Sequence, residues 1–131
     1  MERFLPRPTV VSEPFWKGCR DGELRLQQCT ACQRYIFYPA YMCPHCGAGS
    51  LAWKTTSGLG RVYSCTVVER QAGANDQPIV VALIQLDEGP IMMSNVRAAE
   101  PYSIAIGDRV SVAFERASDE ITLPVFVPVA E

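Results

Sequence analysis

The sequence predicts a mainly β protein, in which a short N-terminal helix and a four-cysteine metal-binding module precede a five-stranded barrel of the OB type. The first observation is a pair of CxxC motifs between residues 29 and 46. The second is a series of five strand-length apolar segments between residues 61 and 129. The third is the lack of any long segment with helical periodicity. Together these favour a small closed barrel. We expect an N-terminal module over residues 1–50 and an OB-fold domain over residues 51–131.

A short helix is expected after an extended, proline-containing arm at residues 1–11. Ser12 is a suitable N-cap, and Pro14 suits the first turn, where a missing N–H costs little. Phe15 and Cys19 are spaced to share one helix face, and Gly22 is a plausible stop signal. Residues 23–29 then alternate in polarity and are expected to form a strand that leads into the first cysteine pair.

The barrel is expected to follow a Gly/Ser-rich connection at residues 47–60, in which Trp53 is the aromatic anchor. Simple alternation along its first strand places Val62, Ser64, Thr66 and Val68 on one face, and Tyr63, Cys65 and Val67 on the other. Prolines confine the last segment to a sheet edge or the end of a ladder. The expected strands are residues 61–70, 79–86, 91–96, 109–115 and 121–129, with a loop at 71–78, a tight turn at 87–90 and a helical turn within 98–108.

Four cysteines are the candidate metal ligands: Cys29, Cys32, Cys43 and Cys46. Each CxxC pair lets two thiolates from one tight turn bind the same ion, and two facing turns complete a tetrahedral site. Gly47 suits the positive φ that such turns need. Zinc is favoured over iron, because the sequence shows no redox-partner surface. Four thiolates leave no open position for water, so we expect one structural Zn²⁺ per chain.

No other residue indicates catalysis. His45 lies inside the second cysteine pair and is expected at the surface or beside the ligands. Cys19 and Cys65 are expected to act as small buried apolar residues. General acid–base catalysis needs a group that titrates near neutral pH, and the sequence contains none of the common nucleophile, phosphate-loop, dinucleotide or zinc-protease motifs. The chain is therefore not expected to be an enzyme by itself, with a thioester hydrolase as the stand-alone alternative.

Composition points to a cytoplasmic protein without a membrane segment. The 131 residues include no apolar run of 18 and no secretory signal at the N-terminus. In a reducing compartment, six cysteines favour a metal site or free thiols over disulfides.

The formal net charge of −2 is distributed unevenly. Residues 1–61 carry eight basic and four acidic side chains, whereas residues 62–131 carry four basic and ten acidic ones. Both zinc ribbons and OB folds can bind single-stranded nucleic acid, which is the alternative function. Such binding needs a basic track interleaved with aromatic rings, and the acidic barrel half argues against it.

Aromatic side chains are concentrated in and around the cysteine module. A module this small has little interior, so several rings must stay exposed unless another surface covers them. Protein interfaces are enriched in aromatic residues and methionine. The alternative is that the rings pack between the module and the barrel. The candidate partner interface consists of Phe15, Trp16, Tyr35, Phe37, Tyr38 and Tyr41, beside Ile36 and Met42.

The chain as a whole resembles the rubredoxin-like zinc-ribbon plus OB-fold family of acyl-CoA-associated proteins. The resemblance rests on the stretches "EPFWKGCRDGELRLQQCTACQRYIFYPAYMCPHCG", "LAWKTTSGLGRVYSCTVVER", "PIVVALIQLDEGPIMMSNV" and "IGDRVSVAFE…LPVFVP", which together span residues 13–128.

This resemblance implies a partner. Members of the family accompany thiolase-superfamily enzymes, so the expected function is that of a non-catalytic accessory subunit. Such a subunit would stabilise a thiolase, acyltransferase or retro-aldolase and help form its acyl-CoA site, while the catalytic groups belong to the partner. The candidates for contacting CoA phosphates are the basic residues Arg25, Arg34, Lys54 and Arg61, which are otherwise ordinary solvated charges.

Overall fold

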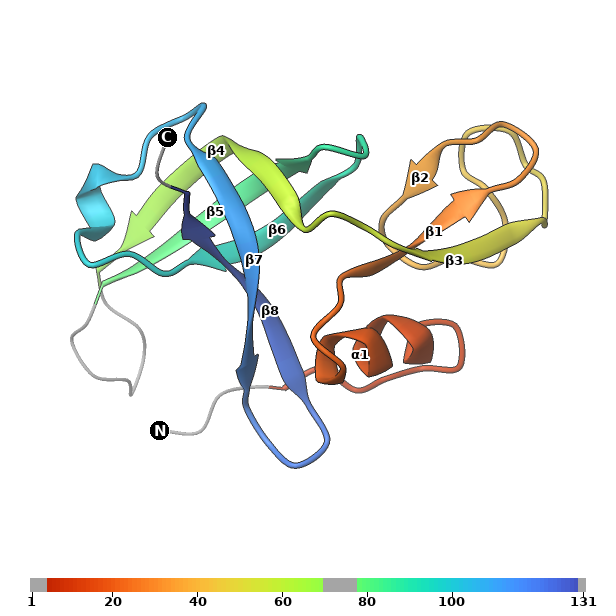
Figure 1. Cartoon of the computed structure of the whole chain (residues 1–131), viewed down its shortest axis with the longest axis horizontal. Coiled ribbons are helices and arrows are strands. Elements are labelled where there is room, and N and C mark those ends of the chain that lie inside the picture. Colours follow the sequence, from red (N-terminus) through yellow and green to blue (C-terminus); the bar gives the residue numbers. More distant parts are fainter. Residues whose placement is uncertain (1–4, 70–77, 130–131) are drawn as a thin grey trace.

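A computed structural model describes residues 5–69 and 78–129, and it confirms the predicted fold class. A three-stranded ribbon and a closed five-stranded barrel lie side by side, with one helix beneath the junction (Figure 1). Most of the loop expected at residues 71–78 lies outside the described residues. The elements are α1 (Glu13–Arg20), β1 (Arg25–Cys29), β2 (Tyr35–Ile36), β3 (Leu51–Thr55), β4 (Leu59–Val68), β5 (Ile79–Leu86), β6 (Ile91–Val96), the 3₁₀ turn η1 (Pro101–Ser103), β7 (Arg109–Arg116) and β8 (Thr122–Pro128).

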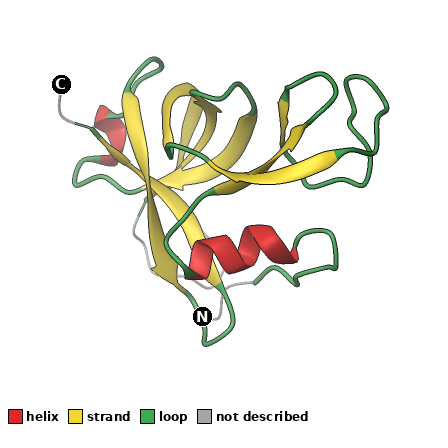
Figure 2. Cartoon of the chain, turned by 45° about the vertical axis from the view of Figure 1, so that its right-hand side comes forward, coloured by secondary structure: helices red, strands yellow, loops and turns green. Residues whose placement is uncertain are grey.

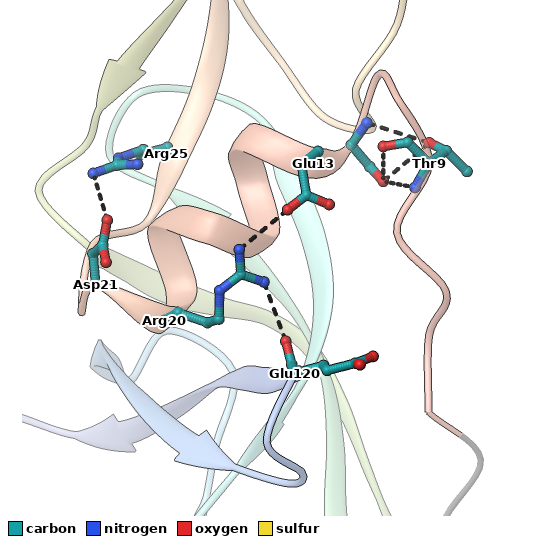
Figure 3. Close-up of polar contacts among 7 residues, drawn as sticks. Thr9, Glu13, Arg20, Asp21, Arg25 and Glu120 are labelled. Carbon is teal, nitrogen blue, oxygen red and sulfur yellow. Dashed lines mark hydrogen bonds and ion pairs between the residues drawn. The ribbon is translucent and has the colours of Figure 1, made fainter.

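Helix α1 forms as predicted, but Ser12 does not cap it through its side chain. Its hydroxyl accepts hydrogen bonds from the backbone N–H and the hydroxyl of Thr9, which closes a turn before the helix (Figure 3). Arg20 bonds Glu13 within the helix and the carbonyl of Glu120 in the β7–β8 turn. This guanidinium therefore ties the helix to the barrel.

The ribbon sheet has the order β2–β1–β3. Part of the expected connection at residues 47–60 is therefore a strand: β3 pairs with all of β1, and Trp53 lies opposite Gln27. The polypeptide changes sheets within residues 56–58, where Gly58 has a φ of +73°. The division into two domains at residue 50 stays a prediction.

The barrel has the closed order β4–β5–β6–β8–β7. The predicted alternation of inward and outward side chains along β4 is wrong after Val62, because a bulge between Val62 and Ser64 shifts the register. Val62 points into the core before the bulge, and Cys65 and Val67 pack against the core after it. One extra residue thus moves the inward positions from even to odd numbers.

Strand β8 closes the barrel between β7 and β6, and its pairing with β6 is limited to the end of that ladder, which agrees with the edge or ladder-end position that its prolines indicated. It pairs antiparallel with β7 over seven residues but meets β6 through a single parallel pair, Val96 and Phe126. The barrel is therefore closed only at one end of the β6–β8 seam. Pro124 can lie in this strand because its neighbour on the β6 side is not a regular ladder.

One apolar core joins the three parts of the molecule. Phe15 of α1, Leu24 just before β1 and Leu26 within it belong to the same buried cluster as the barrel residues Ile84 and Phe126. In Figure 2 the helix lies beneath the ribbon and next to the β7–β8 hairpin, in agreement with its contacts to β1, β7 and β8. Among the described residues, no helix is long and apolar enough to cross a bilayer.

Candidate metal centre and partner surface

The four predicted ligands come together at the end of the ribbon. The Sγ atoms of Cys29, Cys32, Cys43 and Cys46 all lie within 4.8 Å of one another. Cys29 and Cys46 approach to 3.5 Å, and Cys32 and Cys43 to 3.7 Å. A tetrahedral ion with metal–sulfur bonds of about 2.3 Å separates its ligands by about 3.8 Å. The donor set and its spacing therefore fit a four-thiolate metal site.

Two equivalent turns place these sulfurs. The carbonyl of Cys29 accepts from the N–H of Gln33, and the carbonyl of Cys43 accepts from the N–H of Gly47. Both residues at the fourth position after the cysteine have positive φ, +68° for Gln33 and +80° for Gly47. The glycine was predicted. The positive φ of Gln33 was missed, although Gln33 occupies the same position in the first turn as Gly47 does in the second, and this equivalence could have revealed it.

Backbone N–H groups aimed at sulfur stabilise the thiolate form. The N–H of Cys32 donates to Sγ of Cys29 at 3.5 Å and, as the main cause, lowers the pKa of Cys29 to about 7. Burial opposes ionisation of Cys43, but hydrogen bonds from the N–H groups of His45 and Cys46 outweigh it and lower the pKa.

Cys46 differs from the other ligands. The N–H of Ala48 favours its thiolate, but the contact with the sulfur of Cys29 and desolvation prevail and raise the pKa of Cys46 to about 11. Four thiols this close cannot all ionise without a cation, so a metal ion would replace the remaining protons and bind less tightly at low pH.

The histidine and the two remaining cysteines lie outside the ligand set. His45 is exposed, and its Nδ1 lies 3.2 Å from an Arg34 nitrogen. Cys19 is buried, and desolvation raises the pKa of its thiol to about 12. Cys65 packs against the barrel core with its sulfur 3.8 Å from the carbonyl of Ile104.

An aromatic loop projects between the two cysteine turns. Tyr38, Tyr41 and Met42 are 71%, 72% and 61% exposed. The loop is fixed by Gln27, a buried polar residue of β1 that sequence reasoning missed. Its Oε1 accepts from the N–H of Ala40 at 2.7 Å, and its Nε2 donates to the carbonyl of Ala40 at 2.9 Å. The ribbon therefore fixes the backbone of the loop that carries the exposed rings.

The other rings of the predicted interface lie deeper. Phe15 is buried, whereas Trp16, Tyr35 and Phe37 are partly buried and pack against the core. Phe15 contacts Trp16 edge-on with ring centroids 4.9 Å apart, and Phe37 with centroids 5.7 Å apart. The structure thus divides the six candidates: Tyr38 and Tyr41 face outward, and the other four lie mainly between helix, ribbon and barrel.

An apolar groove of about 330 Å³ lies along the open part of the β6–β8 seam. Helix α1 and the aromatic loop form one side, and β6 and β8 form the other. The lining residues include Trp16, Phe37, Tyr38, Met93 and Leu123.

A second, more polar cleft of about 590 Å³ lies between the ribbon and the β5–β6 turn, and it is lined by residues 33–37, 44–45 and 88–91.

The four candidate phosphate contacts are not brought together as one site. Arg25 is neutralised by ion pairs with Asp21 and Glu23. Lys54 is exposed on β3, and Arg61 donates to the carbonyl of Gly107 on the barrel. Arg34 lines the polar cleft.

Comparisons with protein families assign both parts of the chain. Residues 16–52 match the rubredoxin-like zinc ribbon domain of ChsH2, and residues 53–115 match its C-terminal OB-fold domain.

Individual proteins are similar to this chain over most of its length. A probable enoyl-CoA hydratase alpha subunit of Thermomonospora curvata is 38% identical over 94% of the chain, but the chain spans only 40% of that protein. A DUF35 domain-containing scaffold protein of Methanothermobacter thermautotrophicus is 32% identical over 71% of the chain and 72% of its own length. One chain of a solved structure, the Ltp2-ChsH2(DUF35) aldolase, superposes with a TM-score of 0.85 at 33% identity, covering 95% of this chain and 98% of that one.

Proposed function

The chain belongs to the ChsH2 family of proteins that join a rubredoxin-like zinc ribbon to an OB-fold domain, and from this premise we propose that it is a non-catalytic accessory subunit. It binds an enzyme of the thiolase superfamily, stabilises it and helps to form its acyl-CoA site. The resident metal ion is Zn²⁺, one per chain, and its role is structural.

One observation carries the proposal: the similarity to a chain of the Ltp2-ChsH2(DUF35) aldolase extends over almost the whole of both chains. The names of other relatives support it, because one is a scaffold protein and another is a subunit of a hydratase acting on a CoA thioester.

The metal centre supports a structural role. Four thiolates fill a tetrahedral ion, so no position remains for a water or a substrate oxygen. A zinc ion bound there fixes both turns and thereby the aromatic loop between them, since Cys32 and Cys43 frame that loop. The ion supplies rigidity, and the loop supplies the contact surface.

The exposed rings indicate where the partner binds. Tyr38, Tyr41 and Met42 present exposed apolar area, and Tyr38 also lines the apolar groove. Large rings and methionine are the side chains that interfaces favour, and a loop whose backbone is already anchored at Ala40 loses less conformational freedom on binding. The partner therefore covers this loop, and its own reactive groups carry out the chemistry.

Capture of the tagged chain from its native cells, with mass-spectrometric identification of the bound protein, tests this function. We expect a stoichiometric thiolase-fold enzyme, and a Tyr38→Ser/Tyr41→Ser double variant should lose it. A Tyr102→Ser variant, which changes an exposed ring on the barrel, is the control. Identical capture by all three proteins, or recovery of the chain without an enzyme, would contradict the proposal.

A further inference from the structure

The four sulfurs of the candidate metal centre differ in their access to solvent. Cys29 and Cys43 are buried, with 0% and 2% of their surface exposed, and Cys32 is half-buried. Cys46 is the exposed member, in a turn whose residues 44–47 are all exposed. It lines neither the polar cleft nor the apolar groove. A reactive solute therefore reaches Cys46 before it reaches the other three cysteines.

Cys46 also lies next to a second cysteine. Its Sγ is 3.5 Å from Sγ of Cys29. The other close pair, Cys32 and Cys43, is 3.7 Å apart. A disulfide bond is about 2.05 Å long, so the first pair must close by about 1.5 Å. Cys29 ends β1 and is held there by the hydrogen bond from its N–H to the carbonyl of Arg34. The movement therefore falls to the exposed turn that contains Cys46.

This arrangement matches the chemistry of an oxidant-sensitive site. A thiol that binds a metal ion is deprotonated, and the thiolate is the form that peroxides oxidise. Oxidation of a thiolate gives a sulfenic acid, which condenses with a neighbouring thiol to a disulfide. An accessible thiolate with such a neighbour is typical of cysteines that respond to oxidants. Cys46, with Cys29 beside it, meets both conditions once a metal ion is bound.

We propose that the metal centre is a peroxide-sensitive site, in which Cys46 is oxidised first and Cys29 completes a disulfide that releases Zn²⁺. The Cys46 thiolate attacks the O–O bond of hydrogen peroxide and forms a sulfenic acid, and hydroxide leaves. The Cys29 sulfur then attacks the Cys46 sulfur, forms the S–S bond and expels a second hydroxide. Two electrons pass from the two sulfurs to peroxide, and two protons from solvent convert the hydroxides to water. Cys32 and Cys43 remain, and two thiolates are too few for a four-coordinate zinc site.

The aromatic loop responds to this oxidation. Cys32 and Cys43 frame the loop, so it loses support at both ends when the ion leaves. The hydrogen bonds between Gln27 and Ala40 remain as its anchor. The exposed rings are then less well positioned, and the partner binds more weakly. This consequence rests on the proposed function, because it needs an enzyme that covers the loop, whereas the oxidation itself rests only on the proposed zinc ion.

Treatment of the zinc-loaded full chain with hydrogen peroxide tests the site. A metal-sensitive dye follows the release of zinc, and fragmentation of cross-linked peptides by mass spectrometry locates the disulfides. We expect release of about one zinc per chain, with a first disulfide between Cys29 and Cys46. Dithiothreitol and Zn²⁺ should then restore the metal-loaded protein. A first disulfide between Cys32 and Cys43, or zinc retained after Cys46 is oxidised, would overturn the proposal.

Two histidine variants separate the proposed pair from the rest of the centre. Cys46→His and Cys32→His each leave three cysteines and one histidine, a donor set that still binds zinc. Cys46→His should lose zinc to peroxide about tenfold more slowly, because it lacks the accessible thiolate. Cys32→His retains both Cys29 and Cys46 and should lose zinc at least as fast as wild type. Cys65→Ser, outside the centre, should match wild type.

Equal rates of zinc release in the two histidine variants would also contradict the site. If either variant binds no zinc, the first disulfide of the wild-type chain tests the proposal by itself. A chain that holds no zinc before oxidation refutes the zinc site, and capture of no enzyme before oxidation refutes the proposed function. If zinc is released as expected while partner capture is equal before and after oxidation, the oxidation site stands and its effect on the partner is wrong.

Discussion

At the scale of single residues, backbone hydrogen bonds support the four cysteines of the candidate metal centre. The N–H groups of Cys32 and His45 are directed at the sulfurs of Cys29 and Cys43. They favour thiolates before any ion arrives, which strengthens metal binding at neutral pH. Because the turns themselves supply these donors, the ligands and their supporting bonds form together.

Replacing a buried ligand should remove the metal and unfold the ribbon. In Cys43→Ser we expect zinc to fall from about one per chain to nearly none after dialysis. Structural zinc contributes about 10–16 kcal/mol in small peptides, comparable to the roughly 5–15 kcal/mol stability of a whole domain. Metal analysis and thermal unfolding measure this. Cys65→Ser, outside the site, is the control, and a stable metal-free Cys43→Ser protein would show that the ion is dispensable.

Gln27 should contribute to binding of the partner protein but not to binding of the metal ion. Gln27→Ala removes both hydrogen bonds to Ala40, so the unfolding free energy should fall by about 1–3 kcal/mol. The aromatic loop should then bind the partner more weakly, while the zinc content stays unchanged. Urea unfolding, metal analysis and partner affinity test this, with Gln85→Ala on the outer face of β5 as the control. Unaltered partner affinity would mean that the loop needs no anchor.

The ligands were predictable from spacing alone, whereas their support was not. A CxxC pair by itself indicates metal binding, because two thiolates on one tight turn can bind the same ion. Gln27 carries no such signal, because a polar residue in a strand is expected to face water. Its burial depends on the carbonyl and N–H of Ala40, thirteen residues away, which meet it only in the folded ribbon.

At the scale of secondary-structure elements, the junction between ribbon and barrel needs glycine. Gly58 has a left-handed φ of +73°, and a Cβ there would lie 2.5 Å from Cγ1 of Val112. Gly58→Ala should therefore lower the unfolding free energy by about 1–3 kcal/mol. Gly49→Ala, with open space around it and no unusual φ, should be nearly neutral. Chemical denaturation of both variants measures these changes. Equal unfolding free energies for Gly58→Ala and Gly49→Ala would mean that the junction can shift to accept the side chain.

Asp87 should make barrel stability depend on pH. Hydrogen bonds from Arg109 lower the pKa of Asp87 below its ordinary 3.8. The ionised form is thus favoured in the folded state, so its contribution is complete above about pH 4 and is lost as pH falls through the lowered pKa. Asp87→Asn should be less stable at neutral pH and lose less stability on acidification.

The control for this prediction is Asp119→Asn. Its ion pair with Arg116 is largely exposed, and such pairs contribute little. Parallel pH profiles for wild type and Asp87→Asn would contradict the expectation.

The strands of the barrel were predictable, but their faces and closure were not. Residues 79–86 and 91–96 were expected as strands and form β5 and β6 with those bounds. The bulge in β4 has no local signature, because no glycine or proline in "VYSC" marks the extra residue between Val62 and Ser64. The pairing of β8 with β6 was likewise hidden, since local sequence does not reveal that a strand with proline can close a barrel through one pair.

At the scale of the whole molecule, ribbon, helix and barrel share one core, and the ribbon presents an exposed aromatic loop. Phe15 is buried in this shared core and Trp16 packs against it, while their place at a partner interface stays a prediction. Sequence alone could not separate rings that pack internally from rings that face outward, because both kinds occur in the same short stretch. The geometry leaves Tyr38 and Tyr41 exposed, and Tyr38 also lines the groove.

The most direct test of the account is a titration of the purified partner enzyme with this chain, following the partner's carbon–carbon bond reaction. We predict that activity rises and saturates at a fixed ratio of the two proteins. We also predict that the zinc-loaded chain alone is inactive, and that Tyr38→Ser/Tyr41→Ser shifts saturation to at least tenfold higher concentration. Turnover by the isolated chain, or a partner whose activity and stability do not respond to it, would contradict the central claim.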